Sequence, residues 1–191
     1  MADKVVKFVQ MVAYPFMNFY FKKVFDSKVD VKVKLERDKK YIFAPNHQRY
    51  IDPFIIFYSL SFKELYPLLP LKFMATPKYM KKFFSGGILR MFGCYDSSEE
   101  SLKKSIEFLK NNNNLCIFPQ GKLSKGGRGK AKVGVIYIQR EIKGSIIVPV
   151  NINYGGKRAH IIFIKKIKNK KFPNDLQPLA DEVLKVIKQK K

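Results

Sequence analysis

The chain has 191 residues, which suits a single domain with a buried core. Hydrophobic residues make up 46% of it and include 17 Phe and 10 Tyr, so wholesale disorder is excluded. The 38 Lys and Arg against 15 Asp and Glu give a net charge of +23, which favours a polyanionic partner (nucleic acid, an anionic membrane or a phosphorylated substrate) or a solvated lysine-rich surface.

The N-terminal stretch, residues 4–23, is apolar and aromatic. Its longest uncharged run, residues 8–21, is shorter than the roughly 20 apolar residues that a membrane-spanning helix needs, and it contains Pro15. We therefore expect an amphipathic helix, kinked at Pro15, that lies in the membrane interface with its lysines at the headgroups (Lys4, Lys7, Lys22 and Lys23). The alternative is a core helix that packs on the domain.

The rest of the chain alternates predicted strands with predicted helices. Strands are expected over residues 29–35, 41–44, 72–75, 115–118, 145–153 and 160–166. Helices are expected over residues 53–60, 77–91, 98–110, 131–142 and 175–188, the second of them weakened by Gly86 and Gly87. This order predicts a single α/β domain over residues 26–191, with a mixed central sheet flanked by helices, preceded by the interfacial helix of residues 1–25.

The two cysteines, Cys94 and Cys116, are far apart and lack the spacing of metal ligands. We expect both to be small buried apolar residues in a reducing compartment, and we expect no metal site.

His47 is one of only two histidines, and it follows a predicted buried strand. Asp52 comes five residues later, so the two could form a general base and the carboxylate that orients it. On one regular helix such positions point about 140° apart, so the pair needs a non-helical turn after His47. Two plainer interpretations stay open: an ordinary hydrogen-bonded loop histidine, and an Asp52-Pro53 helix start.

Asn46-His47 with Asp52-Pro53 resembles the N-H-x-x-x-x-D signature of the glycerolipid acyltransferase family, which includes 1-acylglycerol-3-phosphate acyltransferases. The resemblance extends over about residues 29–164, and the later blocks keep the family's order. These blocks are residues 74–84 (a basic helix), Phe92-Gly93-Cys94-Tyr95-Asp96 (the second motif), Phe118-Pro119-Gln120-Gly121-Lys122 (the F-P-E-G-T-R block), Gly134, and Val148-Pro149-Val150 (the final V-P-V strand).

The resemblance implies an O-acyltransferase in which His47, oriented by Asp52, deprotonates the hydroxyl of a lysophospholipid acceptor. The acyl thioester donor would be acyl-CoA or acyl carrier protein, with no further cofactor and no nucleic acid partner. The protein would act at an anionic membrane surface, on the cytoplasmic face, as a peripheral or monotopic protein. The residues that would bind substrate are Asn46, Lys78, Gln120, Gly121 and Lys122.

The acceptor block departs from the family's pattern. Gln120 stands where the family usually has Glu, and Lys122 and Leu123 replace the usual Thr and Arg. The planar arginine fork that binds phosphate is therefore absent. Point charges from the following loop could replace it, or the loop could simply be an exposed basic segment (Lys122, Lys125, Arg128 and Lys130).

Two competing functions fit parts of the sequence. A non-catalytic basic protein that binds anionic membranes or nucleic acid would explain the charge, but the chain has no nucleic-acid motif and the ordered blocks would stay unexplained. A hydrolase would need a nucleophile, and neither Ser85 nor Ser124 lies in a nucleophile-elbow context.

Overall fold

The computed structural model describes residues 3–75, 77–81, 83–98, 100–111, 113–123, 130–169 and 171–189. Within these residues, seven strands form one mixed sheet in the order β1-β7-β6-β2-β5-β3-β4. The strands are β1 (Ser27–Val31), β2 (Tyr41–Pro45), β3 (Leu71–Ala75), β4 (Cys94–Asp96), β5 (Asn114–Cys116), β6 (Ile146–Gly155) and β7 (Arg158–Phe163). The β6–β7 pair is antiparallel, and the other neighbouring pairs are parallel.

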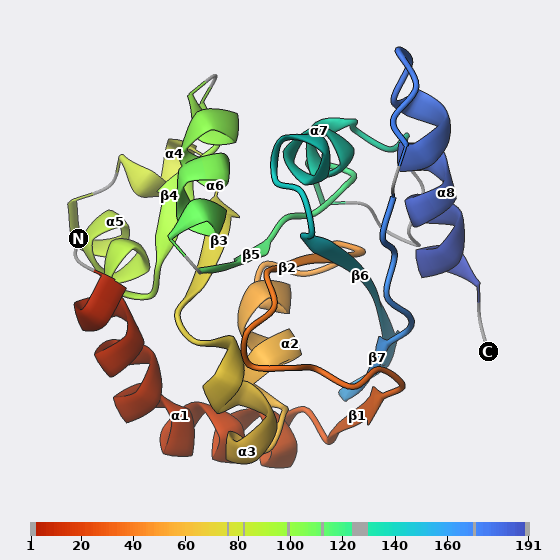
Figure 1. Ribbon diagram of the computed structural model, residues 1–191. Coiled ribbons are helices and arrows are strands. Elements are labelled where there is room, and N and C mark those ends of the chain that lie inside the picture. Colours follow the sequence, from red (N-terminus) through yellow and green to blue (C-terminus); the bar gives the residue numbers. More distant parts are fainter. Residues whose placement is uncertain are drawn as a thin grey trace.

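Helices cover both faces of this sheet (Figure 1). They are α1 (Asp3–Val24), α2 (Asp52–Tyr58), α3 (Phe62–Leu65), α4 (Pro77–Met80), α5 (Phe83–Met91), α6 (Ser101–Lys110), α7 (Gly134–Glu141) and α8 (Gln177–Lys188), with a 3-10 turn at Tyr66–Leu68. Helices α1, α2 and α3 lie on one face and α6, α7 and α8 on the other, while α5 packs beside the edge strand β4. The predicted fold class, a single α/β domain with a mixed sheet and an N-terminal helix, is confirmed.

Strand β2 lies fourth of the seven strands and is buried on both faces. Tyr41 and Phe43 belong to the core under α1 and α2, whereas Ile42 and Ala44 belong to the core under α7 and α8. Successive side chains of a strand point to opposite faces, so a strand with helices on both sides is apolar throughout. This double burial fixes the position at which the chain leaves β2.

Helix α1 is held to the domain by polar side chains. Gln10, Tyr14 and Asn18 are spaced four residues apart, so they share one face of the helix. Each bonds to backbone groups of the domain: Gln10 to Leu71 and Phe92, Tyr14 to Leu60, and Asn18 to Tyr58 and Leu60. The helix thus packs on the domain through this face. None of the described helices is both long and apolar enough to cross a membrane.

Several predicted boundaries were wrong. The helix expected over residues 77–91 is two helices, and it breaks between Met80 and Phe83 rather than at the glycines. Gly86 has a packing role instead, because a Cβ there would lie 2.3 Å from the carbonyl oxygen of Met80. Helix α6 begins at Ser101, not at residue 98, and β1 ends at Val31, not at residue 35.

Besides the 3-10 turn at Tyr66–Leu68, two short elements were not predicted. Strand β4 has three residues, too few to carry a period-two pattern, and it forms by pairing with β3. Helix α3 has four residues and begins with a capping box in which Ser61 and Glu64 bond reciprocally. That Ser-x-x-Glu spacing was a readable signal for the start of a helix.

Candidate active site

The loop between β2 and α2, residues 46–51, carries the candidate catalytic histidine. The parallel strands β2, β3, β4 and β5 all end at the same edge of the sheet, where side chains that follow them can converge. The chain is not helical from Asn46 to Arg49, and α2 begins at Asp52. This supplies the non-helical turn that the spacing of His47 and Asp52 requires.

His47 and Asp52 are in direct contact. The Nδ1 atom of His47 lies 3.0 Å from Oδ2 of Asp52, whose side chain is fully buried. Because a carboxylate only accepts hydrogen bonds, this contact places the proton of neutral His47 on Nδ1 and leaves the lone pair on Nε2. No described residue bonds to Nε2, so that nitrogen is the one available to a substrate.

Backbone groups of the same loop hold Asp52. Its Oδ2 accepts from the N–H groups of Gln48, at 2.6 Å, and Arg49, at 2.8 Å. Helix α2 does begin at Asp52-Pro53, as the plainer interpretation held. Among the described residues, however, the Asp52 carboxylate bonds back to the histidine loop and to Tyr154, not to N–H groups of the helix.

Residues after β5 support His47 from the other side. The His47 ring stacks on Phe118, with 4.0 Å between ring centroids and 28° between planes. The His47 backbone N–H donates to Oε1 of the buried Gln120 at 3.2 Å. Gln120 thus retains the oxygen acceptor that Glu would offer at this position, without its charge.

Asn46, predicted to bind substrate, is placed elsewhere. Its side-chain amide donates to the Ile152 carbonyl at 2.9 Å, and its Oδ1 accepts from the Ile152 N–H at 2.7 Å. The amide therefore continues the β2–β6 ladder past Pro45 as a backbone would. Among the described residues, neither Asn46 nor Gln120 lines the cleft described next.

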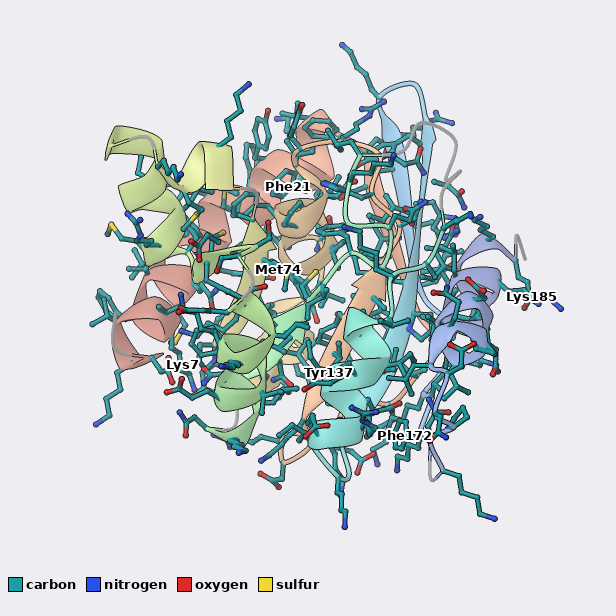
Figure 2. The ribbon with its side chains drawn as sticks, turned by 90° about the horizontal axis from the view of Figure 1, so that it is seen from above. Lys7, Phe21, Met74, Tyr137, Phe172 and Lys185 are labelled. Carbon is teal, nitrogen blue, oxygen red and sulfur yellow. The ribbon has the colours of Figure 1, made fainter. Side chains whose placement is uncertain are left out.

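His47 opens onto a cleft with a volume of about 1220 Å³. Its walls are mainly apolar and come from α2, α5, α6, α7 and the ends of β3, β4 and β5; they include Phe54, Phe73, Met74, Leu89, Leu102, Ile117 and Val135. Figure 2, seen from above, shows Met74 near the middle of the molecule and Lys185 of α8 at one edge. Such a cleft can enclose a long apolar chain beside a base.

Among the described residues, three lysines line the cleft: Lys78, Lys122 and Lys132. Lys78 and Lys122 were predicted to bind substrate, whereas Lys132 was not predicted. The side chain of Lys132 lies against Gly121, which has φ +66°, and a Cβ at Gly121 would lie 2.6 Å from Cε of Lys132. Lys132 could have been indicated by its position two residues before Gly134, within the stretch of sequence that resembles the acyltransferase family.

Other predicted cations are not at the cleft or are outside the described residues. Lys130 lines a separate shallow groove beside α8. Lys125 and Arg128 lie outside the described residues. As for metals, the described part of the chain holds no group of three His, Cys, Asp or Glu side chains that could bind one.

Comparison with known proteins identifies the class of fold first. The structure is similar to one titled "Crystal Structure of the 1-acyl-sn-glycerophosphate (LPA) acyltransferase, PlsC, from Thermotoga maritima", with a TM-score of 0.67 and 20% sequence identity, covering 94% of this chain and 78% of that one. At this identity the likeness is one of fold. No curated protein sequence matches the chain.

The family model for Acyltransferase matches residues 26–153, more than half of the chain. The chain belongs to the Acyltransferase family, as the N-H-x-x-x-x-D signature and the ordered blocks predicted.

Proposed function

We propose that this acyltransferase-family protein works at a membrane surface, where it moves a fatty acyl group from an acyl thioester to the hydroxyl of a lysophospholipid such as 1-acylglycerol-3-phosphate. The observation that carries the proposal is the His47–Asp52 contact of 3.0 Å at the wall of an apolar cleft. The donor is acyl-CoA or acyl carrier protein, and both present the same thioester.

In this mechanism, Nε2 of His47 takes the proton of the acceptor hydroxyl as its oxygen attacks the thioester carbonyl. Asp52 stabilises the imidazolium that forms, because its carboxylate bonds to Nδ1. The tetrahedral intermediate collapses as the C–S bond breaks, and the departing thiolate takes the proton back from His47. The products are an acyl ester and a free thiol, and His47 returns to its neutral form.

The cleft supports a reaction between two large substrates. Its volume of about 1220 Å³ exceeds the roughly 300–1000 Å³ of a site for one small ligand. The apolar walls suit acyl chains, and the three cleft lysines suit a phosphate on the acceptor. An acceptor with a phosphate headgroup therefore fits better than a neutral one.

The decisive variants use the chain's two histidines. We expect His47→Ala to lower acyl transfer to a lysolipid by about 10²–10⁴-fold, because the general base is lost. His160→Ala is the matched control: His160 also bonds a carboxylate, with Nε2 2.7 Å from Oδ2 of Asp30, but does not line the cleft. Lipid products would be followed by mass spectrometry, and folding by circular dichroism.

Retained turnover in a folded His47→Ala protein would contradict the proposed mechanism. The alternative is a non-catalytic basic protein, which the net charge of +23 supports. Salt-sensitive binding of nucleic acid by the wild-type protein, without any acyl transfer, would favour this alternative.

The proposed membrane surface is the outward face of α1. Phe8, Phe16 and Phe19 are 66%, 75% and 63% exposed, and Val5, Val12, Tyr20 and Val24 are also exposed. A helix on a water-facing surface normally turns its polar side out, whereas α1 turns its uncharged polar residues Gln10, Tyr14 and Asn18 to the domain. Lys4, Lys22 and Lys23, exposed near its ends, would meet anionic headgroups.

Vesicle co-sedimentation tests this surface. We expect Phe16→Asp combined with Phe19→Asp to reduce binding to anionic vesicles at least tenfold, since both rings would otherwise enter the lipid and each new charge is costly there. Asn174→Asp is a control with the same charge change per site at an exposed residue before α8. Undiminished vesicle binding by the double variant would contradict the proposal.

A further inference from the structure

Tyr154, near the end of β6, contacts the candidate catalytic carboxylate although it does not line the cleft. Its hydroxyl donates to Oδ1 of Asp52, and the two residues are separated by 102 positions in the sequence. Burial raises the pKa of the Tyr154 phenol, and the neighbouring charge of Asp52 raises it further. The hydroxyl therefore remains a hydrogen-bond donor throughout the pH range in which an enzyme works.

The two oxygens of Asp52 have different partners. Oδ2 accepts from His47 and from the N–H groups of Gln48 and Arg49, whereas Oδ1, among the described residues, accepts from the Tyr154 hydroxyl. Because Asp52 is fully buried, water does not reach Oδ1 to replace that donor. The Tyr154 hydroxyl thus controls how much negative charge Asp52 presents to His47.

Arg49 holds Tyr154 in place. Its guanidinium lies over the Tyr154 ring, 4.0 Å from the centroid, and it donates to the carbonyl of Gly156 in the β6–β7 turn at 3.1 Å. Since the Arg49 N–H also bonds to Asp52, one residue joins the histidine loop to the β6–β7 hairpin. Tyr154 is therefore held in position both by strand β6 and by the histidine loop.

We propose that Tyr154 is a positioning residue that sets the basicity of His47 by donating a hydrogen bond to Oδ1 of Asp52. The proposal rests on the proposed role of His47 as the base. Without the hydroxyl, Oδ1 has one donor fewer, the carboxylate carries more unscreened charge, and the imidazolium of His47 is better stabilised. A histidine that holds its proton more tightly is neutral only at higher pH.

Other ionisable groups surround this cluster and stay unchanged in the test. Among the described residues they are Arg49 over the Tyr154 ring, the buried Cys116 thiol near Asp52, and the cleft residues Tyr50, Lys78, Lys122 and Lys132.

The experiment is Tyr154→Phe, which removes one oxygen and keeps the ring under Arg49. With only two histidines in the chain, NMR follows each imidazole by its own resonances, and His160→Gln assigns them. We expect the titration midpoint of His47 to move to higher pH by about 0.5–1 unit, and the midpoint of His160 to stay where it is. The acid limb of the kcat/KM profile should move by the same amount, a threefold to tenfold loss on that limb, with the alkaline plateau retained.

Tyr137→Phe is the matched control, because Tyr137 lies on α7, contacts Arg140 and does not line the cleft. A folded Tyr154→Phe protein in which the midpoint of His47 is unchanged, or moves to lower pH, would overturn the inference. The NMR titration needs no turnover. Absence of acyl transfer in the wild-type protein would therefore count against the proposed function, whereas the NMR titration would still test the role of Tyr154.

Discussion

The side-chain amide of Gln10 and the backbone of Leu71 exchange two hydrogen bonds. Nε2 of Gln10 donates to the Leu71 carbonyl at 2.8 Å, and the Leu71 N–H donates to Oε1 at 3.0 Å. The amide also donates to the carbonyl of Phe92, 3.0 Å away. A buried glutamine on α1 thus satisfies backbone groups at the start of β3 and just before β4.

Replacing Gln10 with Leu keeps its approximate volume and removes all three bonds. We expect a loss of about 2–4 kcal/mol in the free energy of unfolding, because buried backbone groups are left without partners. Urea denaturation measures the loss. Gln189→Leu, at an exposed position, should change stability by less than about 0.5 kcal/mol, and a similarly small effect at Gln10 would disprove the anchoring role.

Gly121→Ala should displace Lys132 from the cleft wall. The new Cβ would lie 2.6 Å from Cε of Lys132, and the backbone φ of +66° would cost about 1–2 kcal/mol. We expect a higher KM for a phosphate-bearing acceptor with little change in kcat. Gly144→Ala controls for backbone strain, because Gly144 has φ +84° and nothing within 4 Å of its added Cβ. Equal KM values for the two variants would argue against Lys132.

Cys94 should react slowly with alkylating agents although it lines the cleft. Burial raises the pKa of its thiol to about 12, so almost no thiolate is present near neutral pH. Iodoacetamide at pH 8 should modify the folded protein about 10³-fold more slowly than the unfolded chain, with a rate that still rises with pH at pH 10. A rate that levels off near pH 9 would contradict this expectation.

Asp3 should stabilise the fold in a pH-dependent manner through the buried Lys72, whose Nζ lies 2.7 Å from Oδ1 of Asp3. Partial burial raises the pKa of Asp3, but hydrogen bonds from Lys72 and Asn113 outweigh it and leave the pKa below its usual value of 3.8. A lowered folded-state pKa gives stability that is present above the unfolded pKa and is lost as the pH falls through the folded one.

We therefore expect Asp3→Asn to lower the free energy of unfolding at pH 7 by about 0.5–1 kcal/mol, since the Asp3 carboxylate is 39% exposed and solvent screens part of its interaction with Lys72. The difference from wild type should shrink below about pH 4. Asp26→Asn is the comparison, since the Asp26–Arg158 pair is exposed on both sides and should contribute little. Urea denaturation between pH 3 and pH 7 measures both, and a difference that does not depend on pH would refute the assignment.

Much of the site could be predicted because its signals are local. His47 and Asp52 lie in one short loop after a buried strand, and their spacing required the non-helical turn that the structure contains. Asn46 and Gln120 were predicted to bind substrate, yet their side chains bond to the backbone of Ile152 and His47. A sequence motif indicates that such residues belong to the site, but it does not distinguish contact with a substrate from support of the loop.

The α/β class, the central strand and the histidine–aspartate pair can be inferred from the order of residues alone, because alternation of elements, continuous apolar runs and short spacings are all local patterns. The apolar stripe of α1 was also visible, but periodicity shows only which residues share a face. Only the folded chain shows that the polar face of this helix, from Gln10 to Asn18, packs on the domain. Folding also brings Tyr154 to Asp52 and Lys132 to the cleft. These partners lie far apart along the chain, and contacts of that kind depend on strand order, which leaves no local pattern.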